Sequence, residues 1–245
     1  MATAILIDGA YFIKRFRSIE PHNIYNAERA ADCVFRWAVA HLSIKPHSNG
    51  SAQSSVRAAR RHELYRIFFY DCPPLEKKLH NPISKRSVDF SRSQEAVFRK
   101  ELHQRLLAKR KLALRLGHLS NDVPWTIKPE KITELLAGRM AFEGLSPEDV
   151  IPAVRQKGVD MRIGVDVASL AFKKQVDQIV LVAGDADFVP AAKLARREGI
   201  DFVLDPMWRR IPQGLMEHID GLRSTCPKPP ALRAAGGQAE PVDGA

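Results

Sequence analysis

Aspartates at the ends of apolar segments are the residues of this sequence whose types and spacing most directly suggest chemistry. Four segments end in this way: Asp8 in "ILIDG", Asp71 in "FFYDC", Asp185 in "VAGDAD" and Asp205 in "FVLDP". Ligands of an open parallel sheet bind outside the carboxyl ends of its strands, so these aspartates would share one edge. Clustered carboxylates repel one another unless a cation joins them, and oxygen-only clusters suit Mg²⁺ or Mn²⁺. The pattern therefore predicts a divalent-metal site.

The residues that follow each aspartate divide the four into two pairs. Asp71 precedes Cys-Pro-Pro and Asp205 precedes proline. Such aspartates most often form turns, because the side chain accepts hydrogen bonds from nearby backbone N–H groups. We therefore interpret Asp71 and Asp205 as turn residues. If the first strand lies centrally and the chain then crosses to its other side, the strands that end at Asp8 and Asp185 are neighbours, and these two carboxylates converge.

Three further aspartates are candidates to complete the cluster. Asp160 begins a helix expected over 159–173, where an N-cap or an interaction with the helix dipole is the structural alternative. Asp166 lies on the apolar stripe of that helix, where an unpaired carboxylate would be costly. Asp187 is equally suited to cap a helix expected at 188–198, in which proline stands in the first turn. The predicted metal ligands are Asp8, Asp160, Asp166, Asp185 and Asp187.

The elements that must position these residues alternate along the chain. Apolar, non-alternating segments predict buried strands at 3–8, 64–71, 112–117, 178–185 and 200–205. Helical patterns lie between them, at 27–42, 93–111, 159–173 and 188–198. This order predicts an α/β protein, a three-layer α/β/α sandwich with a mostly parallel sheet of about five strands. We expect one domain over 1–225, a mobile polar loop at 45–61 and a disordered tail at 226–245.

The basic residues of the chain indicate a polyanionic partner. The sequence contains 38 Lys and Arg against 28 Asp and Glu, a net charge of +10, and the segment 85–115 alone holds ten basic and three acidic residues. A concentrated basic face suits nucleic acid, although a solvated helix face has the same composition. Predicted phosphate contacts are Arg99, Lys100, Lys109, Arg110 and Lys157. Phe90, Trp125 and Trp208 are candidates to stack unpaired bases, or to lie in the core.

Other features of the sequence restrict the class of protein. The three cysteines, Cys33, Cys72 and Cys226, are far apart and form no C-x-x-C pair, so neither a disulfide framework nor a cysteine zinc site is expected. The eight histidines show no metal-ligand spacing, and no phosphate-binding glycine motif occurs. Apolar runs are too short to cross a bilayer and the first residues do not resemble a secretory signal, so we expect a soluble cytoplasmic protein without membrane contact.

Three motifs together resemble a known family. The sequence opens with "ILIDGAYF", carries "KGVDMRIGVD" before the penultimate predicted strand, and continues with "VLVAGDADFVPAAKLARREGIDF". In this order and spacing they resemble the NYN domain, in its LabA-like branch, within the PIN-like nuclease superfamily. The resemblance spans most of residues 1–222. The sequence departs from the usual pattern of this family at Tyr11, where many relatives carry asparagine, and at Ala183 and Ala186, where serines are common.

The resemblance implies a PIN-like fold whose acidic residues hold Mg²⁺ or Mn²⁺ and hydrolyse RNA phosphodiester bonds. Matched by motif, Asp8, Asp160 and Asp185 are the catalytic acids, and Asp166 and Asp187 accompany them. The expected activity is that of a metal-dependent endoribonuclease acting on single-stranded or structured RNA, and the protein is a candidate homo-oligomer.

Two alternatives remain open on the sequence. The departures at Tyr11, Ala183 and Ala186 favour a non-catalytic RNA-binding or regulatory module of the same fold. The second alternative is a metal-dependent phosphatase. Phosphatases of the haloacid-dehalogenase type carry an Asp-x-Asp motif after the first strand, whereas Asp8 is followed by Gly-Ala, which weakens this alternative.

Overall fold

A central parallel sheet forms the frame of the protein, seen in a computed structural model that describes residues 1–43 and 62–231. Its strand order is β12-β11-β10-β1-β2-β5, and each pair of neighbours is parallel. The strands are β1 (Ala2–Asp8), β2 (Glu63–Asp71), β5 (Leu112–Leu116), β10 (Gln178–Val182), β11 (Asp201–Asp205) and β12 (Gly221–Leu222). All five predicted strands are confirmed, and the short β12 is an edge strand that was not predicted.

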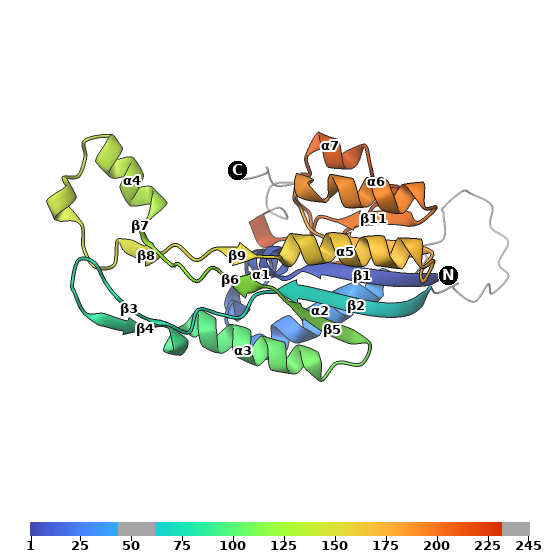
Figure 1. The fold of residues 1–245 in the computed structure, drawn as a ribbon, viewed down its shortest axis with the longest axis horizontal. Helices are drawn as coiled ribbons and strands as arrows, with labels where there is room; N and C mark the ends of the chain where they lie inside the picture. The colour runs from blue at the N-terminus through green and yellow to red at the C-terminus, as the bar shows by residue number, and fades with distance from the viewer. Residues whose placement is uncertain (44–61, 232–245) are drawn as a thin grey trace.

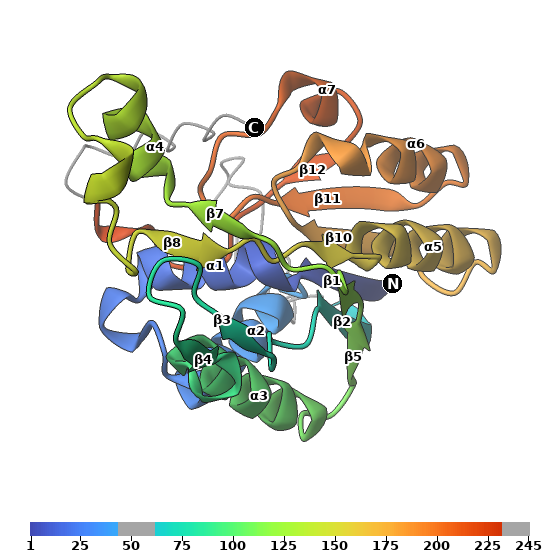
Figure 2. The same cartoon turned by 60° about the vertical axis from the view of Figure 1, so that its left-hand side comes forward.

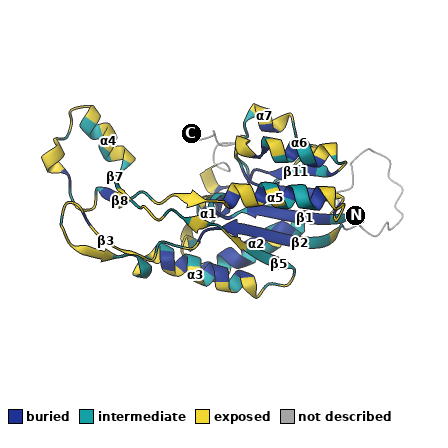
Figure 3. Cartoon of the chain, viewed as in Figure 1, coloured by how far each residue is buried: buried dark blue, intermediate teal, exposed yellow. Residues whose placement is uncertain are grey.

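Helices cover both faces of the sheet, as Figures 1 and 3 show. One face carries α1 (Gly9–Ile19), α2 (Ala27–Ala40) and α3 (Gln94–Leu107), and the other carries α5 (Val159–Phe172), α6 (Val189–Arg197) and α7 (Gln213–Met216). Successive side chains of a strand point to opposite faces, so Ile5 and Ile7 join the first core while Ala4 and Leu6 join the second. The predicted three-layer α/β/α sandwich is confirmed.

The first strand passes into α1 without a connecting loop. Gly9 makes this possible, because a Cβ atom there would lie 2.5 Å from the Tyr70 carbonyl oxygen and 2.7 Å from the Phe69 ring. No side chain larger than hydrogen fits beside β2 at this point. The start of α1, and Asp8 immediately before it, are therefore held close to the end of β2.

Two extensions leave the sheet at the carboxyl ends of its strands (Figures 1 and 2). After β2 the chain forms a hairpin of β3 (Lys78–His80) and β4 (Ser87–Asp89), followed by the 3₁₀ turn η2 (Phe90–Arg92). After β5 it forms a two-stranded stalk of β6 (His118–Leu119) and β9 (Gln156–Lys157). The stalk carries a lobe with β7 (Trp125–Ile127), α4 (Pro129–Leu136), the 3₁₀ turn η3 (Phe142–Gly144) and β8 (Val150–Pro152).

Both extensions were missing from the sequence-based prediction, because their strands contain only two or three residues and alternate weakly. Figure 3 shows the lobe as largely exposed, in contrast to the buried sheet. Leu136 and Phe142, for example, are 84% and 69% exposed. A segment with so little burial lacks the apolar periodicity from which sequence analysis recognises elements.

The packed part of the chain continues beyond the predicted boundary at 225. Cys226 and Pro229 are buried, and the backbone carbonyl of Cys226 accepts a hydrogen bond from the Trp208 indole at 2.8 Å. The predicted loop at 45–61 and the greater part of the predicted tail, 232–245, lie outside the described residues. In the part of the chain that is described, no helix has the length and apolar character needed to cross a membrane.

Candidate functional site

The candidate site lies at the carboxyl edge of the sheet, where strand order reverses. Strands β1 and β10 are hydrogen-bonded neighbours, with Ile7 opposite Val182, so Asp8 and the loop that contains Asp185 leave the sheet side by side. This confirms the predicted adjacency of the two strands. On its other side β1 pairs with β2, and Asp8 lies opposite Tyr70. Such a reversal is where parallel sheets bind ligands.

Asp8 is fixed at the junction of β1 and α1. Its Oδ1 atom accepts a hydrogen bond from the Tyr11 backbone N–H at 3.1 Å, which makes Asp8 the N-cap of α1. The pKa of Asp8 is raised to about 6, chiefly by burial and in smaller part by the negative charges of Asp160 and Asp71, although the hydrogen bond from the Tyr11 N–H lowers it. The carboxylate of Asp8 is thus destabilised by its surroundings and would be stabilised by a cation.

Asp160 lies in the first turn of α5, directly after the stalk. Gly158 is the N-cap residue, with a left-handed φ of 77°, and no side chain caps this end of the helix. The N-cap alternative for Asp160 is therefore not what the structure shows. Asp160 is exposed, yet partial desolvation and the negative charges of Asp185 and Asp187 raise its pKa. Asp160 is thus coupled electrostatically to Asp8 and to both acids of the loop after β10.

Asp185 and Asp187 share the loop between β10 and α6. The Oδ1 atom of Asp185 accepts a hydrogen bond from the Asp187 backbone N–H at 3.2 Å and caps the 3₁₀ turn η4 (Ala186–Phe188). Helix α6 begins after Phe188 and has no side-chain cap, so the expectation that Asp187 caps this helix was wrong. Asp185 caps the preceding turn η4, and not α6. Both carboxylates are exposed to solvent.

Tyr11 packs against this loop. Its hydroxyl group donates a hydrogen bond to the Pro206 carbonyl oxygen at 2.6 Å, across the ends of β10 and β11. A Cβ atom on Gly184 would lie 2.6 Å from the Tyr11 ring. Tyr11 therefore links α1 to the end of β11 through its hydroxyl group and packs its ring against the acidic loop at Gly184. Sequence reasoning identified Tyr11 as unusual but did not predict this contact.

Asp166 does not join the other acids. It lies two turns further along α5, where its Oδ2 atom accepts a hydrogen bond from the Tyr70 hydroxyl at 2.8 Å and lies 3.4 Å from Nε of Arg115. These partners explain how a carboxylate is tolerated on the apolar stripe of the helix. The structure gives Asp166 a packing role between α5 and the edge of the sheet, and does not support its prediction as a metal ligand.

Asp71 was interpreted as a turn residue, and the structure corrects this. The carboxylate is fully buried and accepts hydrogen bonds from Nη1 of Arg99 at 2.5 Å and from Nε2 of His103 at 2.8 Å. Arg99 also binds Glu95, and its side chain is only 14% exposed. Arg99 fastens β2 to α3 and is not available to a phosphate, contrary to its prediction as a substrate contact. Arg99 and His103 are four residues apart on α3, so both reach Asp71 from the same face of the helix.

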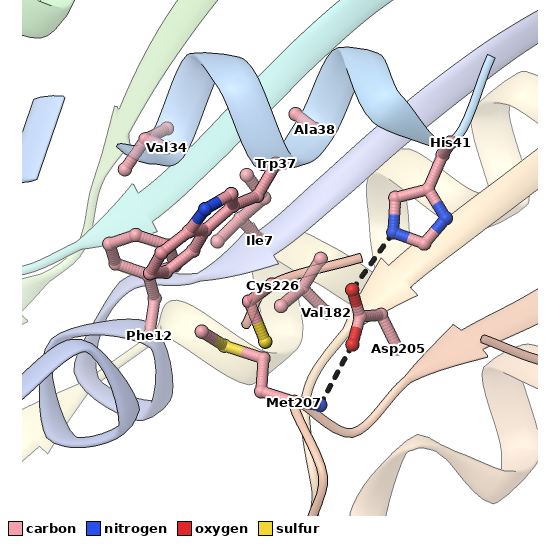
Figure 4. A pocket seen from close by; sticks show the side chains of 10 residues that line it. All are labelled: Ile7, Phe12, Val34, Trp37, Ala38, His41, Val182, Asp205, Met207 and Cys226. Carbon is pink, nitrogen blue, oxygen red and sulfur yellow. Dashed lines mark hydrogen bonds and ion pairs between the residues drawn. The ribbon is translucent and has the colours of Figure 1, made fainter. Parts of the chain in front are cut away.

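Asp205, in contrast, forms the predicted turn, with its Oδ1 atom accepting a hydrogen bond from the Met207 backbone N–H at 2.8 Å. Figure 4 shows its other oxygen facing His41, whose Nε2 atom lies 2.9 Å away. Both side chains are buried beside an apolar cavity of about 10 Å³, lined by Trp37 and Cys226 among others. This is the space of roughly one water molecule, so the pocket is a structural feature and not a ligand site.

The predicted phosphate contacts on and after α3 are largely occupied. Lys100 pairs with Glu76, and Lys109 pairs with Asp32. Arg110 is exposed just before β5, and Lys157 is exposed in the stalk, three residues before Asp160. Of the predicted contacts, Lys157 is the one that the chain places beside the acids.

The donor chemistry of the acidic edge fits a hard divalent cation. Asp8, Asp160, Asp185 and Asp187 offer only carboxylate oxygens, the ligands that Mg²⁺ and Mn²⁺ prefer. Asp8 and Asp160 both have raised pKa values, and in each case part of the cause is another acid of this set. Within residues 1–43 and 62–231, however, no three His, Cys, Asp or Glu side chains are grouped closely enough to hold a metal ion. The acids are neighbours but not a preassembled metal cage.

Comparison with known proteins relates the second half of the chain to a family. The family model described as the NYN domain matches residues 130–209. This span includes Asp160, Asp185 and Asp187, although it does not reach Asp8, and it supports a relation to the nuclease superfamily. A crystal structure of a protein of unknown function from Vibrio parahaemolyticus is similar over 90% of each chain, with 16% sequence identity and a TM-score of 0.41. No curated protein matches the chain.

Proposed function

We propose that this protein is a metal-dependent ribonuclease that hydrolyses RNA phosphodiester bonds at the carboxyl edge of its sheet. The observation that carries the proposal is the position of Asp8 and Asp185 on neighbouring strands at the reversal point, with Asp160 coupled to both sides. The NYN match over Asp160, Asp185 and Asp187 supports the same interpretation. The motifs around these acids further favour the LabA-like branch.

Asp8, Asp160 and Asp185 are the residues that would hold Mg²⁺ or Mn²⁺, with Asp187 beside them. A bound ion of this kind lowers the pKa of a water molecule and stabilises charge on a departing oxygen. The chain supplies the positions: Asp8 is held at the junction of β1 and α1, and the Tyr11 ring packs against Gly184 in the loop of Asp185. Lys157 lies within reach of Asp160 along the chain and would contact a substrate phosphate.

A second candidate is an RNA-binding module without catalytic activity. The specific observation in its favour is Tyr11, which replaces the usual asparagine and uses its hydroxyl on the Pro206 carbonyl. The hydrogen of that hydroxyl is therefore used within the protein and is not available to a water molecule or a substrate. The module would bind RNA through the same edge and leave it intact.

A cleavage assay separates these functions. Labelled single-stranded and structured RNA is incubated with the full chain in Mn²⁺, in Mg²⁺ or in EDTA. We expect cutting that requires metal and falls at least 100-fold in Asp8→Asn and in Asp185→Asn. Asp177→Asn is the matched control, because this carboxylate lies at the opposite edge, bound to the Ala2 backbone N–H. RNA binding without cutting under every metal would support the module, and release of phosphate from small esters would indicate a phosphatase.

A further inference from the structure

The hairpin after β2 has the position of a substrate contact. We call residues 77–89, which contain β3, its turn and β4, the basic hairpin. The chain enters it six residues after Asp71, whose charge contributes to the raised pKa of Asp8. Figures 1 and 2 show it projecting beyond the end of the sheet at which β1 and β10 terminate. A molecule bound at the acidic edge therefore has the basic hairpin on one side.

The cations of the basic hairpin differ from those of α3 in being available. On α3, Arg99 and Arg105 are paired with acidic residues. Lys78, Lys85 and Arg86 are exposed, and none of them forms an ion pair with any residue that the structure describes. Exposed cations outside ion pairs are available to phosphate, and of the three only Lys78 faces an acid within the hairpin, because it lies opposite Asp89.

The basic hairpin is held in a defined place. In its turn, Asn81 Oδ1 accepts hydrogen bonds from the backbone N–H groups of Ile83 and Ser84, both at 3.0 Å. The Asn81 Nδ2 group donates to the Pro147 carbonyl of the lobe at 2.9 Å. Lys77 Nζ donates to the Asn121 carbonyl at 2.8 Å. These bonds tie the hairpin to the second extension, so the backbone that carries its cations is held in a defined position.

The acidic edge cannot supply this attraction by itself. Without a metal ion, the carboxylates of Asp8, Asp160 and Asp185 repel a phosphate backbone. Affinity for RNA under these conditions must come from cations elsewhere on the chain. The unpaired set closest along the chain to the ends of β2 and β1 is that of the basic hairpin.

We propose that the basic hairpin is the main RNA-binding element of the protein, with Lys78, Lys85 and Arg86 contacting backbone phosphates on one side of the acidic edge. This inference rests on RNA being the substrate. It moves the main phosphate contacts from the predicted residues on and after α3 to the hairpin that precedes this helix, and it keeps Lys157 as a further contact.

The test measures binding and not cleavage. Anisotropy of a fluorescent single-stranded RNA is titrated in EDTA, at several salt concentrations, with the full chain and with Lys78→Glu/Lys85→Glu/Arg86→Glu. We expect the triple variant to bind at least tenfold more weakly. The slope of log K against the logarithm of the salt concentration should be shallower by about 0.7 for each phosphate that the hairpin no longer neutralises. The control, Lys173→Glu/Lys193→Glu/Arg197→Glu, makes the same change of charge along α6 and at the end of α5, away from the acidic edge, and should stay within about twofold of the unmodified chain.

A neutral variant guards against misfolding and against general charge effects. Lys85 has a left-handed φ of 58°, which asparagine tolerates, so Lys78→Gln/Lys85→Asn/Arg86→Gln preserves the turn. It should show the same direction of effect with an unchanged circular dichroism spectrum. Three results would overturn the proposal. The control variant could weaken binding as much as the hairpin variants do, both hairpin variants could bind RNA as the unmodified chain does, or the unmodified chain could fail to bind RNA. Binding that requires the hairpin in a protein that never cuts RNA would uphold it while removing the nuclease function.

Discussion

At the scale of single residues, Asp8 shows a conflict between stability and the proposed activity. Its folded-state pKa of about 6 lies above the ordinary value of 3.8, chiefly because the carboxylate is buried. Between these values the folded protein binds more protons than the unfolded chain, so its free energy of unfolding falls as pH rises from about 4 to 6. Above pH 6 the ionised Asp8 destabilises the folded protein by the full amount, unless a bound cation compensates for its charge.

Asp8→Asn should therefore stabilise the metal-free protein. Asparagine can still accept the hydrogen bond from Tyr11 that caps α1, and it removes the buried charge. We expect the free energy of unfolding at pH 7.5 in EDTA to rise by about 2 kcal/mol, with the gain vanishing near pH 4. Urea titrations of both proteins at the two pH values measure this. A variant that is less stable at pH 7.5 would show that Asp8 is not strained by burial.

The contact between Tyr11 and Gly184 gives a second prediction at this scale. Gly184→Ala places a methyl group 2.6 Å from the Tyr11 ring and should destabilise the fold by about 1–3 kcal/mol. Gly164→Ala is the control, since nothing lies within 4 Å of its added carbon, and alanine in α5 should be neutral or stabilising. Thermal unfolding compares them. If Gly184→Ala is also neutral, Tyr11 does not hold the loop.

At the scale of elements, the network of Asp71, Arg99 and His103 fastens α3 to the end of β2. Asp71 and Arg99 are almost wholly buried, and their charges compensate each other. The Arg99 pKa is raised, although burial opposes this, because Asp71 and Glu95 favour the charged form. The network thereby anchors the helix that follows the basic hairpin.

Removal of one partner should be costly. Asp71→Ala leaves Arg99 buried without its main counter-ion, and we expect a loss of about 3–5 kcal/mol in the free energy of unfolding. Arg105→Ala breaks an exposed pair with Glu101 on the same helix and should cost no more than about 0.5 kcal/mol. Chemical denaturation distinguishes the two. Similar losses in both variants would mean that the buried pair has no special role.

The buried strands of the sheet were predicted, whereas the exposed extensions and the buried helix α1 were missed. The runs that became β1 and β10 are apolar throughout because both faces of the sheet are covered, and this is visible in a sequence. The buried ion pair of Asp71 is not visible in the sequence, because its partners are 28 and 32 residues away and only the fold brings them together. The same holds for Asp166, whose position on α5 was correct but whose partners lie on other elements.

At the scale of the whole molecule, net charge predicts a polyanionic partner but does not indicate which surface would contact it. The surplus of the segment 85–115 is mostly neutralised by acids from other elements, such as Glu76 for Lys100 and Asp32 for Lys109. Charge counted along a sequence ignores such pairs, which form only on folding. The arrangement of the sheet, set by the order of apolar runs, was the more reliable guide to where the site lies.

The attachment of both extensions to the carboxyl edge has a consequence for how such proteins diversify. The hairpin interrupts the connection from β2 to α3, and the lobe interrupts the connection from β5 to α5, so neither is inserted between neighbouring strands of the sheet. Insertions and deletions in either extension leave the register of β1 and β10 unchanged. Asp8 and Asp185 therefore keep their places while the surroundings change in length and composition. Mutations in the extensions can therefore change which molecules are recognised without displacing the acids that are proposed to act on them.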